Sequence, residues 1–353
     1  MSSLRGLVDL IGLSSRSKET IVTGIRANGA SVEPGLWVAT RIGSAARVTR
    51  GMRSSPEAGR WTRLKGGRAK VLLLTVAVAV APPMIFRVRG AGGASRALAT
   101  KAGGLILFDD ARKRVVHVAE EPYPADYAER RRFLSEYLPA PAAELSADRL
   151  RLTEDLAAGV AFESLAPGRK RAIARDFMAK ASFLVEQNSS ASATAVVASA
   201  LAAADRAEGL PEHVASRLPE LRPALAAAAA TWPLIPAHGD LTGLNILVEG
   251  EADWSLIDFE DADDLPFFYD AACLLLSDPD LRPDAVNGAF DDDLRRLAQS
   301  AGTAAEPAHL DLYLAATALI AADRHATRHG GRFGQTVQRL WPPVDPPASS
   351  HHA

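Results

Sequence analysis

The sequence contains one cysteine, Cys273, so no disulfide can form within the chain. This absence excludes a disulfide-stapled secreted domain, and no paired Cys/His spacing typical of a zinc site is present either. A reducing, cytoplasmic environment is therefore predicted. Cys273 lies in the apolar segment Ala271–Leu276, and we interpret it as a small core residue rather than a nucleophile.

Long apolar segments are also missing. The longest, Val71–Phe86, has 16 residues and is interrupted near its end by two prolines, whereas a membrane-spanning helix needs about 20 apolar residues. We interpret this segment as a buried strand or helix. Because basic residues flank it on both sides, a segment that lies on a membrane surface is the alternative.

The net charge is only −2, but it is unevenly distributed. Residues 1–101 carry 17 Lys and Arg against 4 Asp and Glu, and the remainder carries 23 against 38. Such asymmetry suggests that the N-terminal part meets an anionic partner. Nucleic acid, an anionic membrane surface and the acidic remainder of the chain are the candidates, beside a basic segment that is merely solvated. No specific nucleic acid is predicted.

The composition is that of a globular chain, with 48% hydrophobic and 23% charged residues. Strand-like patterns precede residue 155 and helical patterns dominate after Pro167, which predicts an α+β fold in two lobes. The expected organisation is a basic, weakly structured extension (1–69), a small β-rich N-lobe (70–152), an inter-lobe linker (153–157), a mainly helical C-lobe (158–341) and a tail (342–353). Strands are expected at 105–108, 115–118, 245–248 and 254–258, and helices at 124–137, 169–185, 191–207, 221–232, 269–276 and 310–328.

One group of polar residues carries chemistry. His238-x-Asp240-x-x-x-x-Asn245 lies between a predicted helix and a predicted hairpin, and Asp258 follows 13 residues after Asn245. Asn245 begins one hairpin strand and Asp258 ends the other, so the side-chain oxygens of both can face one magnesium ion, a hard cation that prefers oxygen ligands. The Asp240 carboxylate precedes them on the loop and can accept the proton of an incoming hydroxyl. This arrangement suits phosphoryl transfer, which needs charge neutralisation and alignment.

Two motifs resemble those of the aminoglycoside phosphotransferase and choline-kinase group within the protein-kinase-like fold. They are His238-Gly239-Asp240-Leu241-Thr242-Gly243-Leu244-Asn245 and Ile257-Asp258-Phe259-Glu260. Gly239 stands where protein kinases have Arg, and Glu260 follows the aspartate of the second motif by two positions. The resemblance implies a bilobal protein-kinase-like fold that binds ATP and Mg, with Asp240 as catalytic base, His238 as a residue that braces the loop, Asn245 and Asp258 as magnesium ligands, and Glu260 as support for a second metal or the substrate.

The N-lobe departs from the family pattern at one position. Aligning Val115–Val118 with the strand that normally carries a phosphate-binding lysine puts His117 in its place, with Glu129 on the next helix as its partner. Lys113 is the alternative, because residues 113, 115 and 117 share one face of an ideal strand.

Other nucleotide contacts follow from the same resemblance. The glycines Gly90, Gly92 and Gly93 are expected to cover the phosphates, because glycine lets backbone N–H groups approach closely, with a simple turn as the alternative. The segment Thr153–Leu156, which includes Glu154, is expected to form the linker whose backbone contacts adenine.

Two acidic features each allow more than one role. The segment Glu260–Asp264 places four carboxylates beside the reaction centre, as a subsite for a cationic substrate or as a solvated loop. Asp270 is expected to cap or anchor the helix that follows it.

The sequence therefore predicts a small-molecule kinase that transfers the γ-phosphoryl group of ATP to a hydroxyl group. Cationic amines and sugars are both candidate acceptors. A pseudokinase-like binding or scaffold protein is the alternative that His117 suggests. A membrane-associated kinase of a cell-envelope sugar, peripheral to the membrane, is the alternative that the basic N-terminal segment suggests.

Overall fold

The computed structural model describes Ile25 and residues 35–39, 44–47, 84–88, 92–99, 104–188, 191–251, 253–303, 307–330 and 332–341. The chain divides into two compact units, which are described separately. The first comprises Met1–Ala125 and Ala142–Leu156, and the second comprises Asp126–Pro141 and Ala157–Ala353. Gly90, the tail from residue 342 and most of the basic extension lie outside the described residues, so their predictions stay open.

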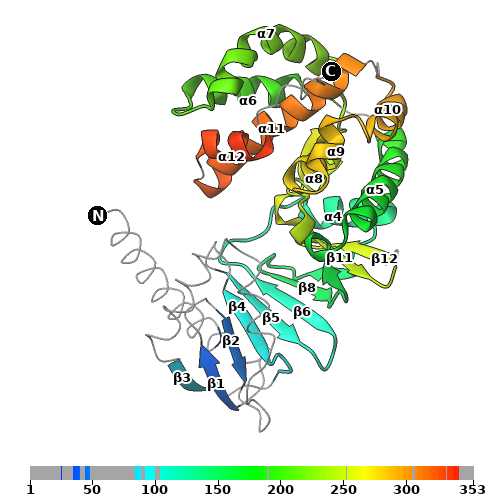
Figure 1. Ribbon diagram of the computed structural model, residues 1–353. Helices are drawn as coiled ribbons and strands as arrows, with labels where there is room; N and C mark the ends of the chain where they lie inside the picture. The colour runs from blue at the N-terminus through cyan, green and yellow to red at the C-terminus, as the bar shows by residue number, and fades with distance from the viewer. Residues whose placement is uncertain are drawn as a thin grey trace, which may run out of the picture. The chain divides into compact units, whose positions relative to one another are not determined.

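The first unit is built on one antiparallel sheet (Figure 1). Among the described residues its strands follow the order β3-β1-β2-β4-β5-β6-β8-β7. Their bounds are β1 Gly35–Ala39, β2 Ser44–Arg47, β3 Met84–Val88, β4 Arg96–Ala99, β5 Leu105–Asp109, β6 Arg114–Val118, β7 Ala143–Leu145 and β8 Arg151–Asp155. Leu105 and Leu107 are buried while Ile106 between them is partly exposed, which is the alternation that a half-buried strand requires. The predicted hairpin of β5 and β6 is confirmed.

Two strands of this sheet lie where the sequence suggested a weakly structured extension. β1 pairs with β2 and β3, and β2 pairs with β4. Their sequences, Gly-Leu-Trp-Val-Ala and Ser-Ala-Ala-Arg, do not alternate between apolar and polar residues, so main-chain pairing reveals them where the side-chain pattern does not. Of the apolar segment Val71–Phe86, the structure describes only the residues from Met84 onward, which belong to β3.

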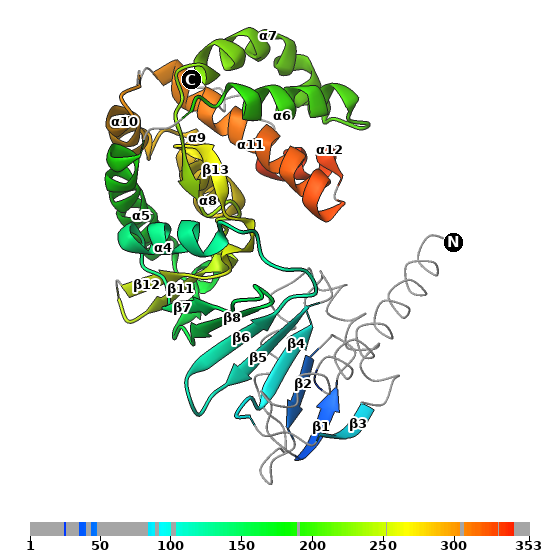
Figure 2. The same ribbon diagram turned by 180° about the vertical axis from the view of Figure 1, so that it is seen from behind.

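The second unit is mainly helical (Figures 1 and 2). Its helices are α4 Tyr127–Tyr137, α5 Pro167–Gln187, α6 Thr194–Arg206, α7 Glu212–Ala229, α8 Tyr269–Ser277, α9 Arg282–Val286, α10 Asp291–Ser300, α11 Pro307–His329 and α12 Phe333–Leu340. In both views α11 lies beside α6 and α12, and it also packs against α8. This mixed arrangement, a sheet followed by helices, confirms the predicted α+β fold.

Two details of the second unit differ from the sequence expectation. Helix α4 was assigned to the N-lobe, but its segment Asp126–Pro141 belongs to the second unit because α4 packs against α5 and the strand Leu234–Ala237. Helix α7 begins at Glu212 rather than near Leu221. Pro219 and Pro223 lie inside it, and each removes a backbone N–H donor, so the sequence pattern favours a later start.

Two small sheets complete this unit and carry the polar motifs. β10 (Leu234–Ala237) pairs with β13 (Asp263–Pro266), and β11 (Ile246–Glu249) pairs with β12 (Asp253–Leu256) and β9 (Val160–Ala161). An aromatic cluster holds the start of β10 against α8 and α11. Trp232 contacts Phe268 edge-on with ring centroids 4.8 Å apart, and Phe268 stacks on Tyr313 at 4.3 Å. Such buried aromatic pairs contribute about 1 kcal/mol beyond the area they bury.

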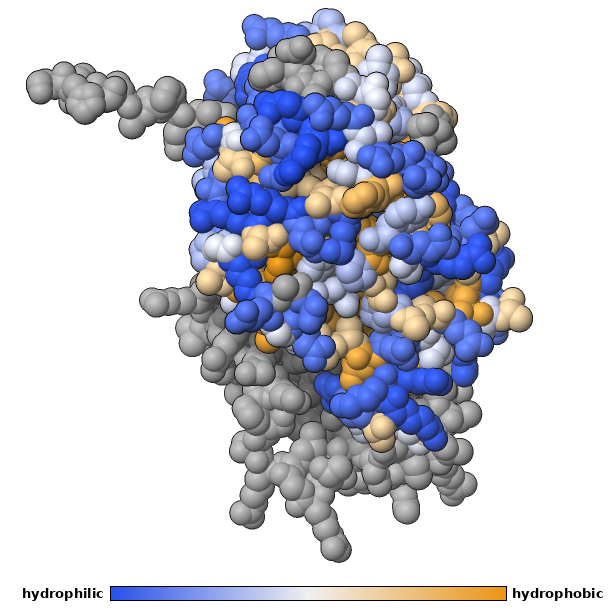
Figure 3. Space-filling model, turned by 90° about the vertical axis from the view of Figure 1, so that its right-hand side faces the viewer, coloured by the Kyte–Doolittle hydropathy of each residue, from blue (hydrophilic) through white to orange (hydrophobic). Residues whose placement is uncertain are grey.

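The surface gives no sign of a broad apolar face in the parts that the structure describes. Hydrophilic side chains dominate the face shown in Figure 3, and apolar side chains gather there only in small separate patches. The large apolar side chains that are exposed among the described residues are Val160, Phe183 and Val286. Within the same residues, no helix is long and apolar enough to cross a membrane.

A buried ion pair ties α5 to the C-terminal end of α8. The Nζ of Lys170 lies 2.8 Å from Asp278 and 2.7 Å from Asp280, and the Lys170 side chain is only 2% exposed. Asp278 is fully buried, so it depends on this cation for charge compensation.

We expect Lys170→Met to lower the free energy of unfolding by about 3 kcal/mol, because it leaves the Asp278 carboxylate buried and unpaired. Urea denaturation measures this loss. Arg295→Met is the matched control, since Arg295 pairs with Asp292 at the surface, and it should cost less than about 1 kcal/mol. Equal losses in the two variants would contradict the role given to Lys170.

Candidate active site

The loop His238–Asn245 connects β10 to β11, and a buried carboxylate holds its first two residues. One Asp270 oxygen accepts the backbone N–H of His238 at 2.6 Å, and the other accepts that of Gly239 at 3.0 Å. Asp270 is in the first turn of α8, yet its side chain makes no cap hydrogen bond to that helix. Of the expected roles of capping or anchoring α8, the contacts fit the anchor, because the carboxylate ties the start of the helix to the loop.

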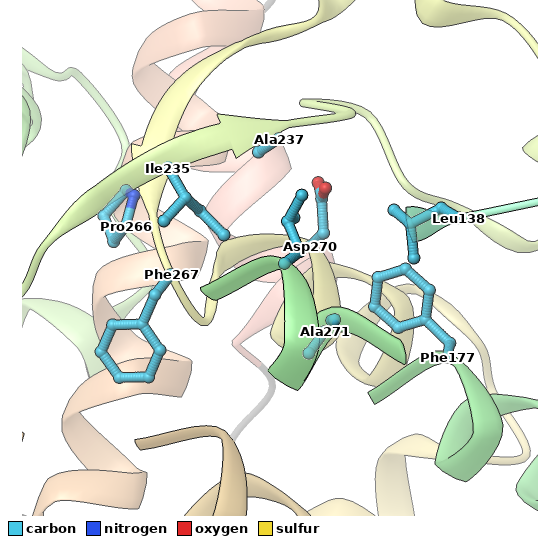
Figure 4. Close-up of a pocket in the computed structure, with 10 residues that line it drawn as sticks. Leu138, Phe177, Ile235, Ala237, Pro266, Phe267, Asp270 and Ala271 are labelled. Carbon is cyan, nitrogen blue, oxygen red and sulfur yellow. The ribbon is translucent and has the colours of Figure 1, made fainter. Parts of the chain in front are cut away.

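A small cavity lies behind this contact (Figure 4). Its volume is about 10 Å³, which is at the lower limit for one water molecule and too small for a substrate. Apolar side chains form most of its wall, and the Asp270 carboxylate points away from them toward the end of β10. The Asp270 oxygens are therefore committed to the backbone of the loop.

Gly239 is required by the shape of the loop. Its φ is +83°, and a Cβ at this position would lie 2.0 Å from the carbonyl oxygen of Asp261. A side chain is excluded by both the left-handed backbone and this close approach. The glycine of the motif thus allows the segment after Asp258 to pack directly on the loop.

His238 braces the same two segments. Its Nε2–H donates to the carbonyl oxygen of Ile257 at 2.8 Å, and its ring packs on Phe259 with centroids 4.7 Å apart. The residue is fully buried, and its Nδ1 has no hydrogen-bond partner within the described part of the chain. These contacts suit the structural role predicted for His238. Because the side chain is fully buried, it is not placed to contact a substrate.

Asn245 connects Asp240 to the hairpin. Its Nδ2 donates to the backbone oxygen of Asp240 at 2.8 Å and lies 3.4 Å from an oxygen of the Asp240 carboxylate. Its own backbone oxygen accepts the N–H of Ile257 at 3.0 Å, so Asn245 lies next to the residue that precedes Asp258. The structure thus brings together Asp240, Asn245 and Asp258, as the sequence predicted.

The predicted metal ligands form a donor set that suits magnesium. Asn245 uses its amide nitrogen in these bonds, which leaves the amide oxygen to face a cation. Asp258 is exposed, has a left-handed backbone with φ of +66°, and makes no side-chain hydrogen bond within the described residues. Glu260 is exposed in the short 3-10 helix Phe259–Asp261. No cluster of three or more His, Cys, Asp or Glu forms a metal site among the described residues, so an ion here would need phosphate and water to complete its shell.

The pKa of the Asp240 carboxyl is raised above its usual value. Desolvation by the surrounding protein is the largest cause, and the like charges of Asp261 and Asp258 act in the same direction. His238 and Arg339 act to lower it. The residue remains exposed to solvent, so the raised pKa does not reflect a carboxyl sealed inside the protein.

The acidic segment that follows Glu260 is neutralised by arginines from two helices. Asp263 lies 3.1 Å from Arg130 of α4, 2.6 Å from Arg324 and 2.6 Å from Arg328 of α11. Burial acts to raise the pKa of Asp263, yet the guanidinium groups of Arg324 and Arg328 hold it below its usual value. This carboxylate belongs to an internal ion-pair network.

The neighbours of Asp263 belong to the same network. Asp264 pairs with Arg130 at 3.2 Å, and Asp261 pairs with Arg328 at 2.9 Å. Arg324 also donates to the backbone oxygen of Asp261 at 2.6 Å. We define the arginine–aspartate network as the six residues that make these ion pairs: Arg130, Asp261, Asp263, Asp264, Arg324 and Arg328. Three of the four acidic residues of Glu260–Asp264 thus pair with arginines, and the subsite for a cationic substrate stays a prediction.

The predicted nucleotide residues of the first unit lie in β6, β8 and the chain before β4. His117 Nε2 lies 2.7 Å from a Glu154 oxygen, and both side chains are largely buried. Glu154 is inside β8 rather than in a linker, and its partner is His117. Lys113 lies in the turn before β6 with φ of +52°. The alternation argument therefore does not apply to Lys113, because that argument requires an extended backbone.

Gly92 and Gly93 belong to the same unit as His117 and Glu154, whereas Glu129 does not. Gly92 and Gly93 precede β4, and a Cβ at Gly93 would lie 2.1 Å from the Asp109 carboxylate. Close packing on Asp109 is reason enough for a glycine at this position. Glu129 is exposed in the first turn of α4. That helix belongs to the second unit, so the predicted pairing of Glu129 with His117 stays a prediction.

Three functional residues were missed or misjudged from the sequence. Asp270, Asp261 and Arg324 act on the loop from positions 22 to 86 residues away. A local pattern carries no information about such partners. The only available signal was a buried acidic residue at the start of a strongly apolar helix, Tyr269–Leu276, which burial rules flag as needing a partner.

Comparison with known families and with solved structures gives the following matches. A family model described as the phosphotransferase enzyme family matches residues 114–313. Among solved structures, the aminoglycoside phosphotransferase APH(3'')-Id from Streptomyces rimosus is 17% identical, with 64% of this chain and 90% of that chain covered and a TM-score of 0.41. A macrolide 2'-phosphotransferase from Brachybacterium faecium is 17% identical, with coverage of 69% and 89% and a TM-score of 0.45.

A third solved structure, a choline/ethanolamine kinase family protein from Mesorhizobium loti, is 16% identical, with coverage of 67% and 82% and a TM-score of 0.46. Comparison with curated protein sequences gives no match. The family model, which spans more than half of the chain, is the comparison that carries weight.

We expect the Asp240 carboxyl to titrate above the ordinary aspartate pKa of about 3.9. Asp261→Asn removes a like charge, so it should lower the pKa of Asp240 toward that value. Carbon-detected NMR of the Asp240 carboxyl measures both. Asp264→Asn is the control, because its charge is not among those acting on Asp240. An unchanged pKa in Asp261→Asn would contradict this electrostatic account.

Proposed function

This chain belongs to the phosphotransferase enzyme family, and we propose that it transfers the γ-phosphoryl group of ATP to a hydroxyl group of a small molecule. The observation that carries the proposal is a pair of hydrogen bonds made by Asn245. Its amide nitrogen donates to the backbone oxygen of Asp240, and its backbone oxygen accepts the N–H of Ile257, the residue before Asp258. Asn245 thereby fixes the position of the proposed base, Asp240, relative to the candidate metal ligand Asp258. Phosphoryl transfer depends on such alignment more than on covalent chemistry.

Asp240 is the base in this proposal. Its carboxylate is exposed, so an acceptor hydroxyl can reach it. Its raised pKa makes it a better proton acceptor than an ordinary aspartate. It orients the hydroxyl and takes the proton as the new O–P bond forms. Asn245 holds the carboxylate side of the loop in place through its hydrogen bonds.

Asn245 and Asp258 would hold the magnesium ion, and Glu260 would support it. The open amide oxygen of Asn245 and the unbonded carboxylate of Asp258 are the oxygen ligands that such an ion requires. When bound, magnesium neutralises charge on the phosphates of ATP. Asp270 and His238 hold these ligands in position. Asp270 binds the backbone at the start of the loop His238–Asn245, and His238 binds the backbone of Ile257, which precedes Asp258.

A binding or scaffold protein is the second candidate, and one observation favours it. His117 stands where the family pattern has a phosphate-binding lysine, and Glu154 already engages it at 2.7 Å. A lysine carries a full charge at neutral pH, whereas an unperturbed histidine is only partly protonated. Weak nucleotide binding would follow, although a scaffold has no need for Asp240, Asn245 and Asp258 together. The hypothesis of a membrane-associated kinase depends on the basic N-terminal segment, most of which lies outside the described residues.

We expect Asp240→Asn to lower turnover about 1,000-fold, within the range for loss of a general base. The measurement is ADP release in the presence of acceptor. Asp264→Asn should retain most of its activity, because Asp264 pairs with Arg130 rather than facing the loop. Unfolding temperatures of both variants serve as the check on folding. ATP turnover at the unaltered rate in Asp240→Asn would refute the assignment of the base.

We expect Mg-ATP to raise the free energy of unfolding by about 2.7 kcal/mol at 100 times its Kd. Asp258→Asn should require a higher magnesium concentration for the same stabilisation, whereas Asp253→Asn, at the far end of β12, should not. Magnesium titrations at fixed ATP, followed by thermal unfolding, measure this. Failure of the unaltered protein to respond to millimolar Mg-ATP would favour the scaffold reading over the kinase.

A further inference from the structure

The ring of Phe259, the residue that follows Asp258, contacts two side chains from distant parts of the chain. Phe259 is buried. The guanidinium carbon of Arg131, in α4, lies over the ring at 4.6 Å from its centroid. The imidazole of His238 packs on the same ring with centroids 4.7 Å apart. The residue next to the candidate metal ligand is therefore tied to helix α4 as well as to the loop.

Arg131 is fixed at its own end of this contact. Its side chain belongs to the buried face of α4 and the residue is 3% exposed. Its Nη2 donates to the backbone oxygen of Pro141 at 3.2 Å, and its own backbone oxygen accepts the Ser135 hydroxyl at 2.8 Å. Helix α4 packs in turn against α5 and β10. The guanidinium group thus reaches Phe259 from a helix that the rest of the unit holds in place.

Asp258 has a backbone conformation that its neighbours must maintain. Its φ of +66° and ψ of +63° are left-handed, which costs free energy for a residue with a side chain. Such a conformation persists where the surrounding structure leaves no alternative. On one side, Ile257 donates its N–H to the Asn245 carbonyl at 3.0 Å, and its own carbonyl accepts from His238 at 2.8 Å. On the other side, the ring contacts of Phe259 supply the restraint.

Filling the core does not by itself account for an arginine at this position. An apolar side chain of similar volume would occupy the space without the cost of desolvating a guanidinium group. A cation over an aromatic ring is attracted to it, and more strongly where water is excluded. The preceding residue, Arg130, pairs with Asp263 at 3.1 Å and Asp264 at 3.2 Å. Two consecutive arginines of α4 therefore contact the segment after Asp258, one at its start and one at its end.

We infer that Arg131 is a positioning residue that acts through Phe259 and holds Asp258 in the left-handed conformation that leaves its carboxylate exposed for a metal. This inference rests on the proposed function, because it takes Asp258 as a metal ligand. Arg131 itself contacts neither metal nor substrate in this account. Residues that orient metal ligands without touching the ion change metal affinity by about 10–100-fold. Helix α4 would therefore help to set the metal affinity of the site.

The test titrates Mn²⁺ into the full chain at a fixed, saturating concentration of a non-hydrolysable ATP analogue and follows thermal unfolding. The metal–nucleotide equilibrium in solution is the same for every variant, so a shift in the Mn²⁺ midpoint comes from the protein. Arg131→Met should raise the midpoint about tenfold, the lower end of the range for residues that orient metal ligands. Arg131→Lys keeps a cation for the ring and should raise it less. Arg132→Met, at the exposed next position of α4, should match the unaltered protein.

Hydrogen exchange without metal or nucleotide gives a readout that is independent of the ligands. The Ile257 amide, which donates to Asn245, should exchange faster in Arg131→Met because the segment around Asp258 opens locally, while amides within α5 keep their rates. Faster exchange in both places with an unchanged Mn²⁺ midpoint would make Arg131 a residue of general stability only, and would overturn the inference.

Asp258→Asn separates the inference from the function on which it rests. A raised midpoint in Asp258→Asn with an unchanged one in Arg131→Met overturns the inference alone. An unchanged midpoint in both removes Asp258 as a metal ligand, and the proposed function fails with the inference. If Arg131→Met does not fold, Phe259→Leu removes the same contact from the other side and must raise the midpoint. Where both fold, the double variant should show no larger shift than the larger single one, because the two residues act as a pair.

Discussion

The candidate site depends on the two hydrogen bonds that the Asp270 carboxylate accepts from the backbone of His238 and Gly239. A buried carboxylate is costly unless its oxygens are satisfied. Here the burial of Asp270 is compensated by the loop, and the loop gains a fixed starting direction. Helix α8 carries Asp270 at one end, and the Lys170–Asp278 pair and the Arg282–Leu276 contact tie down the other. The helix therefore acts as a rigid reference for the residues around Asp240.

Charge in the second unit is arranged by sign and by availability. In the arginine–aspartate network, the three aspartates are neutralised by the three arginines. The network also holds the segment after Asp258 against the loop, where Gly239 leaves room for the Asp261 carbonyl. Asp240 and Asp258 stay exposed, and Arg339 stays without an ion-pair partner in the described residues. The paired charges shape the site, while the unpaired ones are left to meet ligands.

The parts of this account that the sequence foretold depend on residues with distinctive chemistry at short spacing. The family and the approach of Asp240, Asn245 and Asp258 follow from two motifs within 23 residues. The α+β fold follows from strand-like patterns before residue 155 and helical patterns after Pro167. Contacts between distant segments could not be read in the same way. Asp270 was expected to cap or anchor its own helix, and its bonds to the loop were not foreseen. The segment Glu260–Asp264 was expected to be a cationic-substrate subsite or a solvated loop, because its partners Arg130, Arg324 and Arg328 come from other helices. The short strands β1 and β2 were missed for a different reason, since main-chain pairing defines them. In the first unit, the pairing of His117 with Glu154 required the register of β6 and β8, which no local pattern supplies.

The central claim is that Asn245 and Asp258 present their oxygens to one magnesium ion beside Asp240. The most direct test is a crystal of the full chain grown with Mn²⁺ and a non-hydrolysable ATP analogue, with the metal located by anomalous scattering. The account predicts a peak at coordination distance, about 2.0–2.2 Å, from the Asn245 amide oxygen and an Asp258 carboxylate oxygen. Bound nucleotide with no metal at these two residues, or with the metal held elsewhere, would contradict it.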